Sequence, residues 1–121
     1  ELLARSDVLT LHLPKTKQPL GLYTAEVLAK LRRDCVLINT CRGGIVDERA
    51  LKERLKSGAL VAACSDVFVT EPADDDELLN LPTFLATPHI GAATEPSRMA
   101  MGRAAIRGLS ENILLEEGQF F

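Results

Sequence analysis

Three short polar segments contain the residues of this chain that could perform acid–base chemistry. Each follows an apolar run that is predicted to be a strand, and the segments are Asn39–Gly44, Asp66–Pro72 and Thr87–Gly91. Between them they supply an arginine, Arg42, a glutamate, Glu71, and a histidine, His89. In an open parallel α/β sheet, ligands bind outside the carboxyl ends of the strands. The pattern therefore predicts an acid–base site for a small anion.

Each of these three side chains also has an ordinary alternative role when it is considered alone. Arg42 could form a surface ion pair, Glu71 could be a solvated loop acid, and His89 could be a structural or surface histidine. The combination is more specific. A guanidinium binds a carboxylate through two parallel hydrogen bonds, and an imidazole exchanges protons near neutral pH.

The composition limits the class of protein. The chain has 121 residues, enough for one domain, and 46% of them are apolar, enough for a core without disulfides. The formal net charge is −3, whereas a nucleic-acid binder normally carries a basic surplus. No apolar run approaches the ~20 residues that cross a bilayer. We therefore expect neither nucleic acid nor a membrane as a partner.

The cysteines predict a reducing compartment. Cys35, Cys41 and Cys64 are odd in number and lie in apolar or strand-like surroundings, which favours free thiols and a cytoplasmic location. Their spacing does not match a zinc site, so no metal is expected. Cys41 directly precedes Arg42 in the predicted site.

Strands are predicted to alternate with helices along the chain. The predicted strands are 7–13, 35–39, 60–66 and 83–86; the predicted helices are 25–32, 48–57 and 95–116, with a short helical turn around Leu78 and Leu79. Thr24, Asp47 and Thr94 are the expected helix caps. This order predicts a parallel sheet with right-handed crossovers.

Two burial patterns are expected from the apolar residues. The strand 35–39 is almost entirely apolar, which is typical of a strand covered on both faces. In the last helix an apolar stripe is expected to pack in the core, and it consists of Met99, Ile106, Leu109 and Ile113.

The three polar segments resemble motifs of one enzyme family. The run from Asn39 to Glu48 resembles the arginine signature of the NAD-dependent D-isomer-specific 2-hydroxyacid dehydrogenases, Asp66–Pro72 resembles their glutamate motif, and Thr87–Ala92 resembles their histidine motif. The similarity extends over about residues 2–116. One departure is Ser65, where the family usually has an apolar residue.

The resemblance implies a fold and a domain organisation. It implies a Rossmann-type doubly wound parallel α/β sheet, of which residues 1–121 are the second half of the nucleotide-binding domain plus the following helix. A glycine-rich pyrophosphate motif and a substrate domain are absent from the sequence, so the chain is expected to be a fragment of a longer polypeptide.

The resemblance also implies roles for the catalytic residues. Arg42 would bind the carboxylate and carbonyl of a 2-oxo acid, His89 would exchange a proton with the C2 oxygen, and Glu71 would orient the imidazole and favour its charged form. The reaction would be hydride transfer between nicotinamide and the C2 carbon of a small 2-hydroxy or 2-oxo acid.

The cofactor implied is NAD. Its expected contacts are His12, Leu13, Pro14, Thr40, Cys41, Arg42, Asp66, His89, Gly91 and Ala92. Asp66 would bind the nicotinamide carboxamide. Its alternative role is to form a turn at the end of a strand. His12 would lie near the adenosine. Alternatively, it would be a histidine packed within a strand.

Two other functions remain open from the sequence. One is a non-catalytic, NAD-sensing interaction protein of the corepressor type, which shares the fold and a similar triad. The other is a half-domain without activity of its own, whose uncovered sheet edge and apolar face would favour self-association. A full-length homodimer is also expected from the resemblance.

Overall fold

The structure, a computed structural model, describes residues 1–13 and 21–111. The chain divides into two units, Glu1–Pro88 and His89–Phe121. Pro14, one of the expected cofactor contacts, and Ile113 of the predicted apolar stripe lie outside the described residues.

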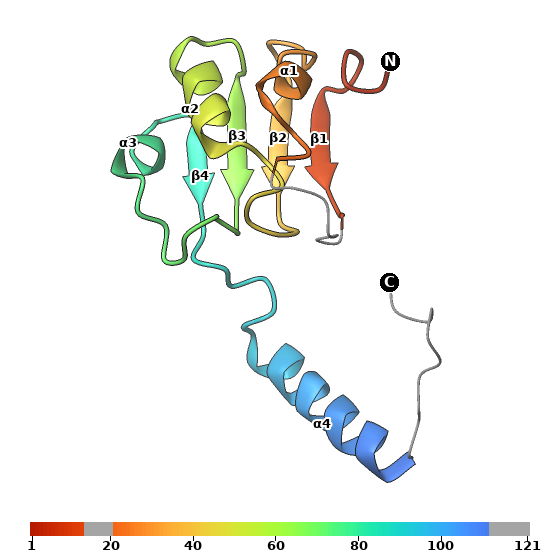
Figure 1. The fold of residues 1–121 in the computed structure, drawn as a ribbon. Coiled ribbons are helices and arrows are strands. Elements are labelled where there is room, and N and C mark those ends of the chain that lie inside the picture. Colours follow the sequence, from red (N-terminus) through yellow and green to blue (C-terminus); the bar gives the residue numbers. More distant parts are fainter. Residues whose placement is uncertain (14–20, 112–121) are drawn as a thin grey trace. The chain divides into compact units, whose positions relative to one another are not determined.

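The order of the elements confirms the predicted alternation of strands and helices (Figure 1). The first unit contains, in order, β1 (Val8–Leu11), α1 (Ala25–Leu28), β2 (Val36–Asn39), α2 (Glu48–Lys56), β3 (Ala62–Ser65), α3 (Asp76–Leu79) and β4 (Phe84–Ala86). The second unit contains α4 (Glu95–Glu111).

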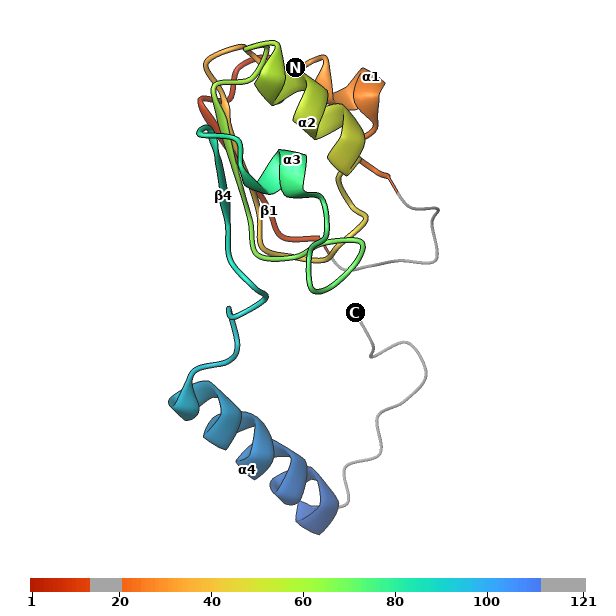
Figure 2. The ribbon, with the colours of Figure 1, turned by 90° about the vertical axis from the view of Figure 1, so that its left-hand side faces the viewer.

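The four strands form one parallel sheet in the order β1-β2-β3-β4. This confirms the α/β fold class, with a Rossmann-type parallel sheet. The spatial order of the strands is the same as their order in the sequence, so every crossover moves in the same direction across the sheet. Right-handed crossovers in one direction place their helices on one face. Figure 2 shows α1, α2 and α3 together on one side of the sheet.

The core lies between these helices and the sheet. Register aligns Leu9, Leu37, Ala63 and Phe84 in one row across the four strands. All four are buried, with exposed fractions between 1% and 8%, and they belong to one apolar cluster with residues of the helices such as Leu28, Leu51, Leu55 and Leu78.

We call the opposite face of the sheet the helix-free face. Its exposure contradicts the prediction that the strand 35–39 is covered on both faces. Its rows are Val8, Val36 and Ala62, and Thr10, Ile38, Cys64 and Leu85. Val8 is 58% exposed and Leu85 63% exposed, and β2 alternates between half-buried and buried residues. The strand 35–39 is therefore not covered on both faces in the described chain, because all three crossovers of the first unit fall on the same side.

The helix starts are confirmed at the predicted caps. Thr24 accepts a hydrogen bond from the Val27 amide at 3.4 Å, and Asp47 accepts one from the Ala50 amide at 3.0 Å. Gly58, at the end of α2, has the left-handed φ of 68° that a C-terminal cap requires.

Helix α1 is shorter than the predicted 25–32. It ends at Leu28, because the next amides, those of Lys30 and Leu31, bond to carbonyls only three residues back. Arg32 and Arg33, which were expected near the end of this helix, instead bond to other segments. Arg32 pairs with Asp7 and Asp34.

In the second unit, α4 begins after the predicted cap, since the Thr94 hydroxyl accepts the Ser97 amide at 3.4 Å. The expectation that its apolar stripe is core is wrong for the described residues. Met99, Ile106 and Leu109 are 53%, 69% and 84% exposed, because residues 89–111 contain no second helix or strand on which they could pack. Among the described residues, no helix combines the length and the apolar character needed to span a membrane.

Candidate active site at the carboxyl edge of the sheet

The strand ends bring the polar loops of the first unit to one edge. Because the strands are parallel, their arrowheads in Figure 1 all point toward this edge. Register places Leu11, Asn39, Ser65 and Ala86 in the last row before it. The segments that follow contain His12, Arg42, Asp66 and Glu71. The predicted site residues of the first unit are therefore on neighbouring loops.

The loop after β2, residues 40–44, is organised by the buried side chain of Asn39. Its Oδ1 accepts the Cys41 amide at 3.3 Å and the Cys41 thiol at 3.0 Å. Its Nδ2 donates to the Arg42 carbonyl at 3.3 Å. An Asn that bonds to the backbone two residues ahead forms an Asx turn. The side chain thus fixes the backbone on both sides of the arginine.

The Arg42 side chain is exposed at this edge. Its Nη1 donates to the Cys41 carbonyl at 2.7 Å. One of its five N–H donors therefore anchors it to its own loop, while the others remain suited to a carboxylate. Thr40 is also exposed, and Cys41 is half-buried with a free thiol.

Gly43 allows this loop to approach the next one closely. A Cβ atom built on Gly43 would lie 1.8 Å from the Phe68 carbonyl oxygen and 2.9 Å from the Val69 amide nitrogen. No side chain fits there without a shift of one backbone. The arginine loop and the loop after β3 are therefore in direct backbone contact.

The loop after β3, residues 66–72, contains the predicted Glu71. Its carboxylate Oε1 accepts the Phe68 amide at 3.0 Å, and the Glu71–Pro72 peptide bond is cis. The next amide, that of Val69, donates to Glu48 Oε1 of α2 at 2.7 Å. Two carboxylates, one from the loop itself and one from the helix, thus hold two consecutive amides of this loop.

Asp66 opens the same loop and is 7% exposed. The hydroxyl of Thr87, which follows β4, donates to Asp66 Oδ1. The preceding Ser65, the departure noted in the sequence, is buried. Its hydroxyl donates to the Val67 carbonyl at 2.7 Å, so the polar group is satisfied and the departure is accommodated locally.

His12 and Leu13 follow β1 at the same edge. His12 is exposed, and its Nε2 lies 2.9 Å from the Thr10 hydroxyl, whose side chain is on the helix-free face. The alternative of a histidine packed in a strand is therefore not what the structure contains. Leu13 is 38% exposed.

His89, Gly91 and Ala92 belong to the second unit. His89 has a φ of 52°, in the left-handed region that residues other than glycine seldom occupy, although His is among those that tolerate it. Residues held in such conformations cluster at functional sites. All three residues are exposed.

Three further residues shape the edge but were not among the predicted site residues. Asn39 orders the arginine loop, Glu48 binds the Val69 amide and Thr87 bonds to Asp66. The Asn39 turn has a sequence signal, because Asn commonly bonds to its own backbone after a strand. A contact between residues as far apart in the sequence as Glu48 and Val69 has no such sequence signal.

Glu48 has an unusual electrostatic environment. Burial raises the pKa of its carboxyl above the ordinary value, and the nearby carboxylates of Asp75, Asp74 and Asp47 raise it further, while the Val69 amide opposes the change. Among residues 1–13 and 21–111, no group of three or more His, Cys, Asp or Glu side chains could hold a metal ion.

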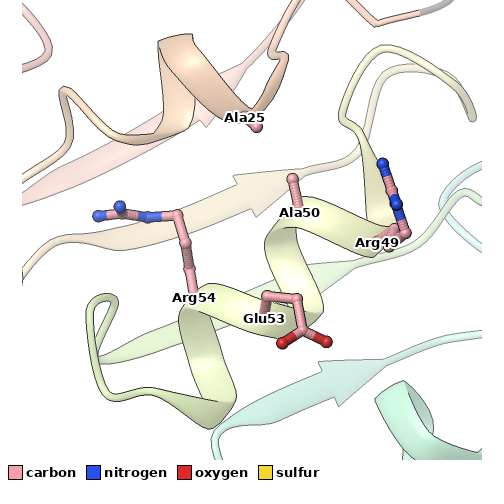
Figure 3. Close-up of a pocket in the computed structure, with 5 residues that line it drawn as sticks. All are labelled: Ala25, Arg49, Ala50, Glu53 and Arg54. Carbon is pink, nitrogen blue, oxygen red and sulfur yellow. The ribbon is translucent and has the colours of Figure 1, made fainter.

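A hollow of about 400 Å³ lies between α1 and α2 (Figure 3). It is lined by Ala25, Arg49, Ala50, Glu53 and Arg54. Figure 3 shows the two guanidinium groups at opposite ends of the hollow, pointing in different directions. Arg54 is also engaged with backbone, since it donates to the Leu31 and Ala59 carbonyls. The charged groups that line this hollow therefore do not point toward a common binding position.

Comparison with known proteins identifies the family. The model of the D-isomer specific 2-hydroxyacid dehydrogenase NAD-binding domain matches residues 1–91, more than half of the chain. The chain belongs to the D-isomer specific 2-hydroxyacid dehydrogenase family. The match covers Arg42, Glu71 and His89. The chain is thus an NAD-binding domain of an oxidoreductase family, which confirms the resemblance and the cofactor expected from the sequence.

Individual relatives support this assignment. The chain is 44% identical over 102 residues to D-3-phosphoglycerate dehydrogenase of Mycobacterium leprae, which covers 84% of this chain and 19% of that protein. The structure of a glyoxylate reductase from Paecilomyes thermophila matches with a TM-score of 0.88 and 32% identity, covering 97% of this chain and 37% of that one.

A third relative was solved with a cofactor. The D-isomer specific 2-hydroxyacid dehydrogenase from Xanthobacter autotrophicus Py2, in complex with NADPH and MES, matches with a TM-score of 0.77 and 36% identity over 93% of this chain and 48% of that one. The chain spans less than half of each of these relatives, and about a fifth of the first.

The carboxyl edge fits a nicotinamide cofactor chemically. Asp66 is a buried carboxylate, the type of acceptor that a carboxamide N–H₂ requires, and Thr87 holds its Oδ1. The edge is also where open α/β sheets bind ligands.

Proposed function

We propose that this chain is the part of an NAD-dependent dehydrogenase that transfers a hydride between the cofactor and the C2 carbon of a small 2-hydroxy or 2-oxo acid. The observation that carries the proposal is the pair of neighbouring loops that presents Arg42 and Glu71 at one edge of the sheet, in a chain of this family. A permanently charged donor beside a carboxylate suits the binding of an anionic substrate and the orientation of an imidazole.

Arg42 would bind the substrate carboxylate and polarise the C2 carbonyl through its guanidinium. Its Nη1 donates to the Cys41 carbonyl, and the side chain is exposed, so its other N–H groups are suited to a carboxylate. A lysine would supply the charge but not the two parallel donors.

His89 would act as the proton donor and acceptor. During reduction its imidazolium gives a proton to the C2 oxygen, and during oxidation the neutral ring takes that proton back, an exchange for which an imidazole side chain is suited. Glu71 would bond to the other ring nitrogen and favour the charged form. The left-handed φ of His89 supports a specialised role for this residue.

Bound NAD would supply the hydride chemistry, and the chain's residues would supply position and charge. Asp66 would accept a hydrogen bond from the carboxamide. Thr40, Cys41 and Arg42 would border the nicotinamide, with Gly91 and Ala92 allowing close approach. His12, Leu13 and Pro14 would lie near the adenosine.

Residues 1–121 would be one part of a two-domain subunit, the second half of its nucleotide-binding domain, and would be inactive alone. We further propose that the complete protein is a cytoplasmic homodimer. The three free thiols, Cys35, Cys41 and Cys64, support a reducing compartment. The exposed apolar side chains of α4 support burial against another surface.

Turnover of a panel of 2-oxo acids with NADH tests the proposal. The assay uses the complete natural polypeptide that contains residues 1–121 and follows the loss of NADH absorbance. Reduction of at least one member, with the 2-hydroxy acid as product, is the expected result. Binding of NADH without turnover of any member would instead favour an NAD-sensing interaction protein.

A further inference from the structure

Glu48 stands apart from the residues that the proposed reaction uses. It is the first residue of α2, and its half-buried carboxylate accepts the Val69 amide at 2.7 Å, across 21 residues of sequence. Val69 lies in the loop of Glu71. Helix α2 is thereby tied to the glutamate loop by a bond between a charged acceptor and a backbone donor, a kind stronger than a neutral pair.

The Glu48–Val69 bond is one of several contacts that connect α2, the loop after β3 and the arginine loop after β2. The Gly43 backbone lies against the Phe68 carbonyl. The Phe68 amide donates to Glu71, and the next amide donates to Glu48. A shift of residues 68 and 69 would therefore move both the Glu71 carboxylate and the surface against which the arginine loop packs.

We propose that Glu48 is a positioning residue, which holds the backbone at Val69 so that the Glu71 carboxylate keeps its place relative to Arg42. The inference rests on the proposed function, because it assigns Glu48 an effect on the acid–base step. Glu48 itself touches neither substrate nor cofactor in this account. It acts through the Val69 amide.

The surroundings of Glu48 disfavour its charge, yet its carboxylate is held in a hydrogen bond to the glutamate loop. Asp47, Asp74 and Asp75 lie near enough to disfavour its charge, and burial does the same. Burial of a charged group is costly unless it is hydrogen-bonded. The Val69 amide supplies that bond, so removal of the acceptor affects the loop directly, whereas a neutral acceptor of the same shape retains the link.

Three variants of the complete natural polypeptide test the inference. Glu48→Ala removes the acceptor, and Glu48→Gln retains an oxygen of similar reach without the charge. Glu53→Ala is the matched control, since Glu53 is an exposed glutamate on the same helix. The readouts are kcat, the KM values for 2-oxo acid and NADH, the pH profile of kcat, and hydrogen exchange of the Val69 amide.

We expect Glu48→Ala to lower kcat between about 10- and 100-fold, the scale of a displacement near 1 Å, with the KM for NADH within about twofold. The midpoint of the pH profile should move to lower pH, because a displaced Glu71 favours the imidazolium less. The Val69 amide should exchange faster. Glu48→Gln and Glu53→Ala should retain kcat within about threefold.

The outcomes separate the two hypotheses. An active wild type whose Glu48→Ala variant keeps kcat and the pH midpoint overturns the positioning role alone, even if the variant is less stable. A wild type without turnover overturns the proposed function and this inference with it. Should Glu48→Ala fail to fold, a Glu48→Gln variant that has lost Val69 protection yet keeps full kcat also overturns the role.

Discussion

The two faces of the sheet differ sharply although the same strands build both. On the helix-covered face, Leu9, Leu37, Ala63 and Phe84 are at most 8% exposed. On the helix-free face, Val8 and Leu85 are more than half exposed. Alternate residues of a strand point to opposite faces, so neighbours in sequence have opposite environments.

The difference arises from topology rather than from the residue types, because both faces are largely apolar. Three crossovers in one direction cover one face, and among the described residues of the first unit the other face has no helix. At the carboxyl edge, Asn39, Glu71 and Asp66 accept hydrogen bonds that hold the polar loops of the candidate site.

The largest effect that would test this comparison is on the stability of the 121-residue chain. Leu37, 1% exposed, and Ile38, half-buried, are adjacent in β2 and point to opposite faces. We expect Leu37→Ala to lower the free energy of unfolding by about 3 kcal/mol. Ile38→Ala should cost about 1 kcal/mol. Urea unfolding measures both, and equal losses would contradict the difference between the faces.

Thiol reactivity gives a second, smaller test. Cys35 is fully buried, and burial raises the pKa of its thiol, with further smaller contributions from Asp34 and Asp7. Its reactive thiolate is therefore scarce at neutral pH. Cys64, on the helix-free face, is half-buried. Alkylation of the native chain followed by peptide mapping should label Cys64 at least about tenfold faster than Cys35. Preferential labelling of Cys35 would refute the assignment of faces.

The smallest expected effect concerns association. Exposed apolar surface favours self-association, so the 121-residue chain should form oligomers at high concentration. Leu85→Lys places a charge on the helix-free face, in the edge strand β4, and should weaken the association several-fold, as light scattering across a concentration series would show. Thr83→Lys, outside the strand rows, is the control. A wild-type chain that stays monomeric contradicts this prediction.

The sequence predicted features that depend on neighbouring residues. Thr24, Asp47 and Thr94 cap helices because a side-chain oxygen reaches an amide three residues ahead. The order of strands and helices follows from the apolar runs and the turns between them. The motifs around Arg42, Glu71 and His89 placed the chain in its family.

Features that depend on distant residues were not predictable in this way. The exposure of the helix-free face and of the α4 stripe depends on which other elements pack there, not on the apolar pattern itself. The Glu48–Val69 bond and the Gly43–Phe68 contact join separate loops. A sequence signal exists for Gly43 only as a glycine pair, which indicates a turn rather than a loop contact.

The central claim is that Arg42, Glu71 and His89 act together on a 2-oxo acid, and the turnover of the His89→Ala variant tests it most directly. In the complete natural polypeptide, the variant should reduce the best 2-oxo acid with a kcat about 10²–10⁴-fold below that of the wild type, while its dissociation constant for NADH stays within about twofold. A kcat within about fivefold of the wild type would show that the proton comes from elsewhere.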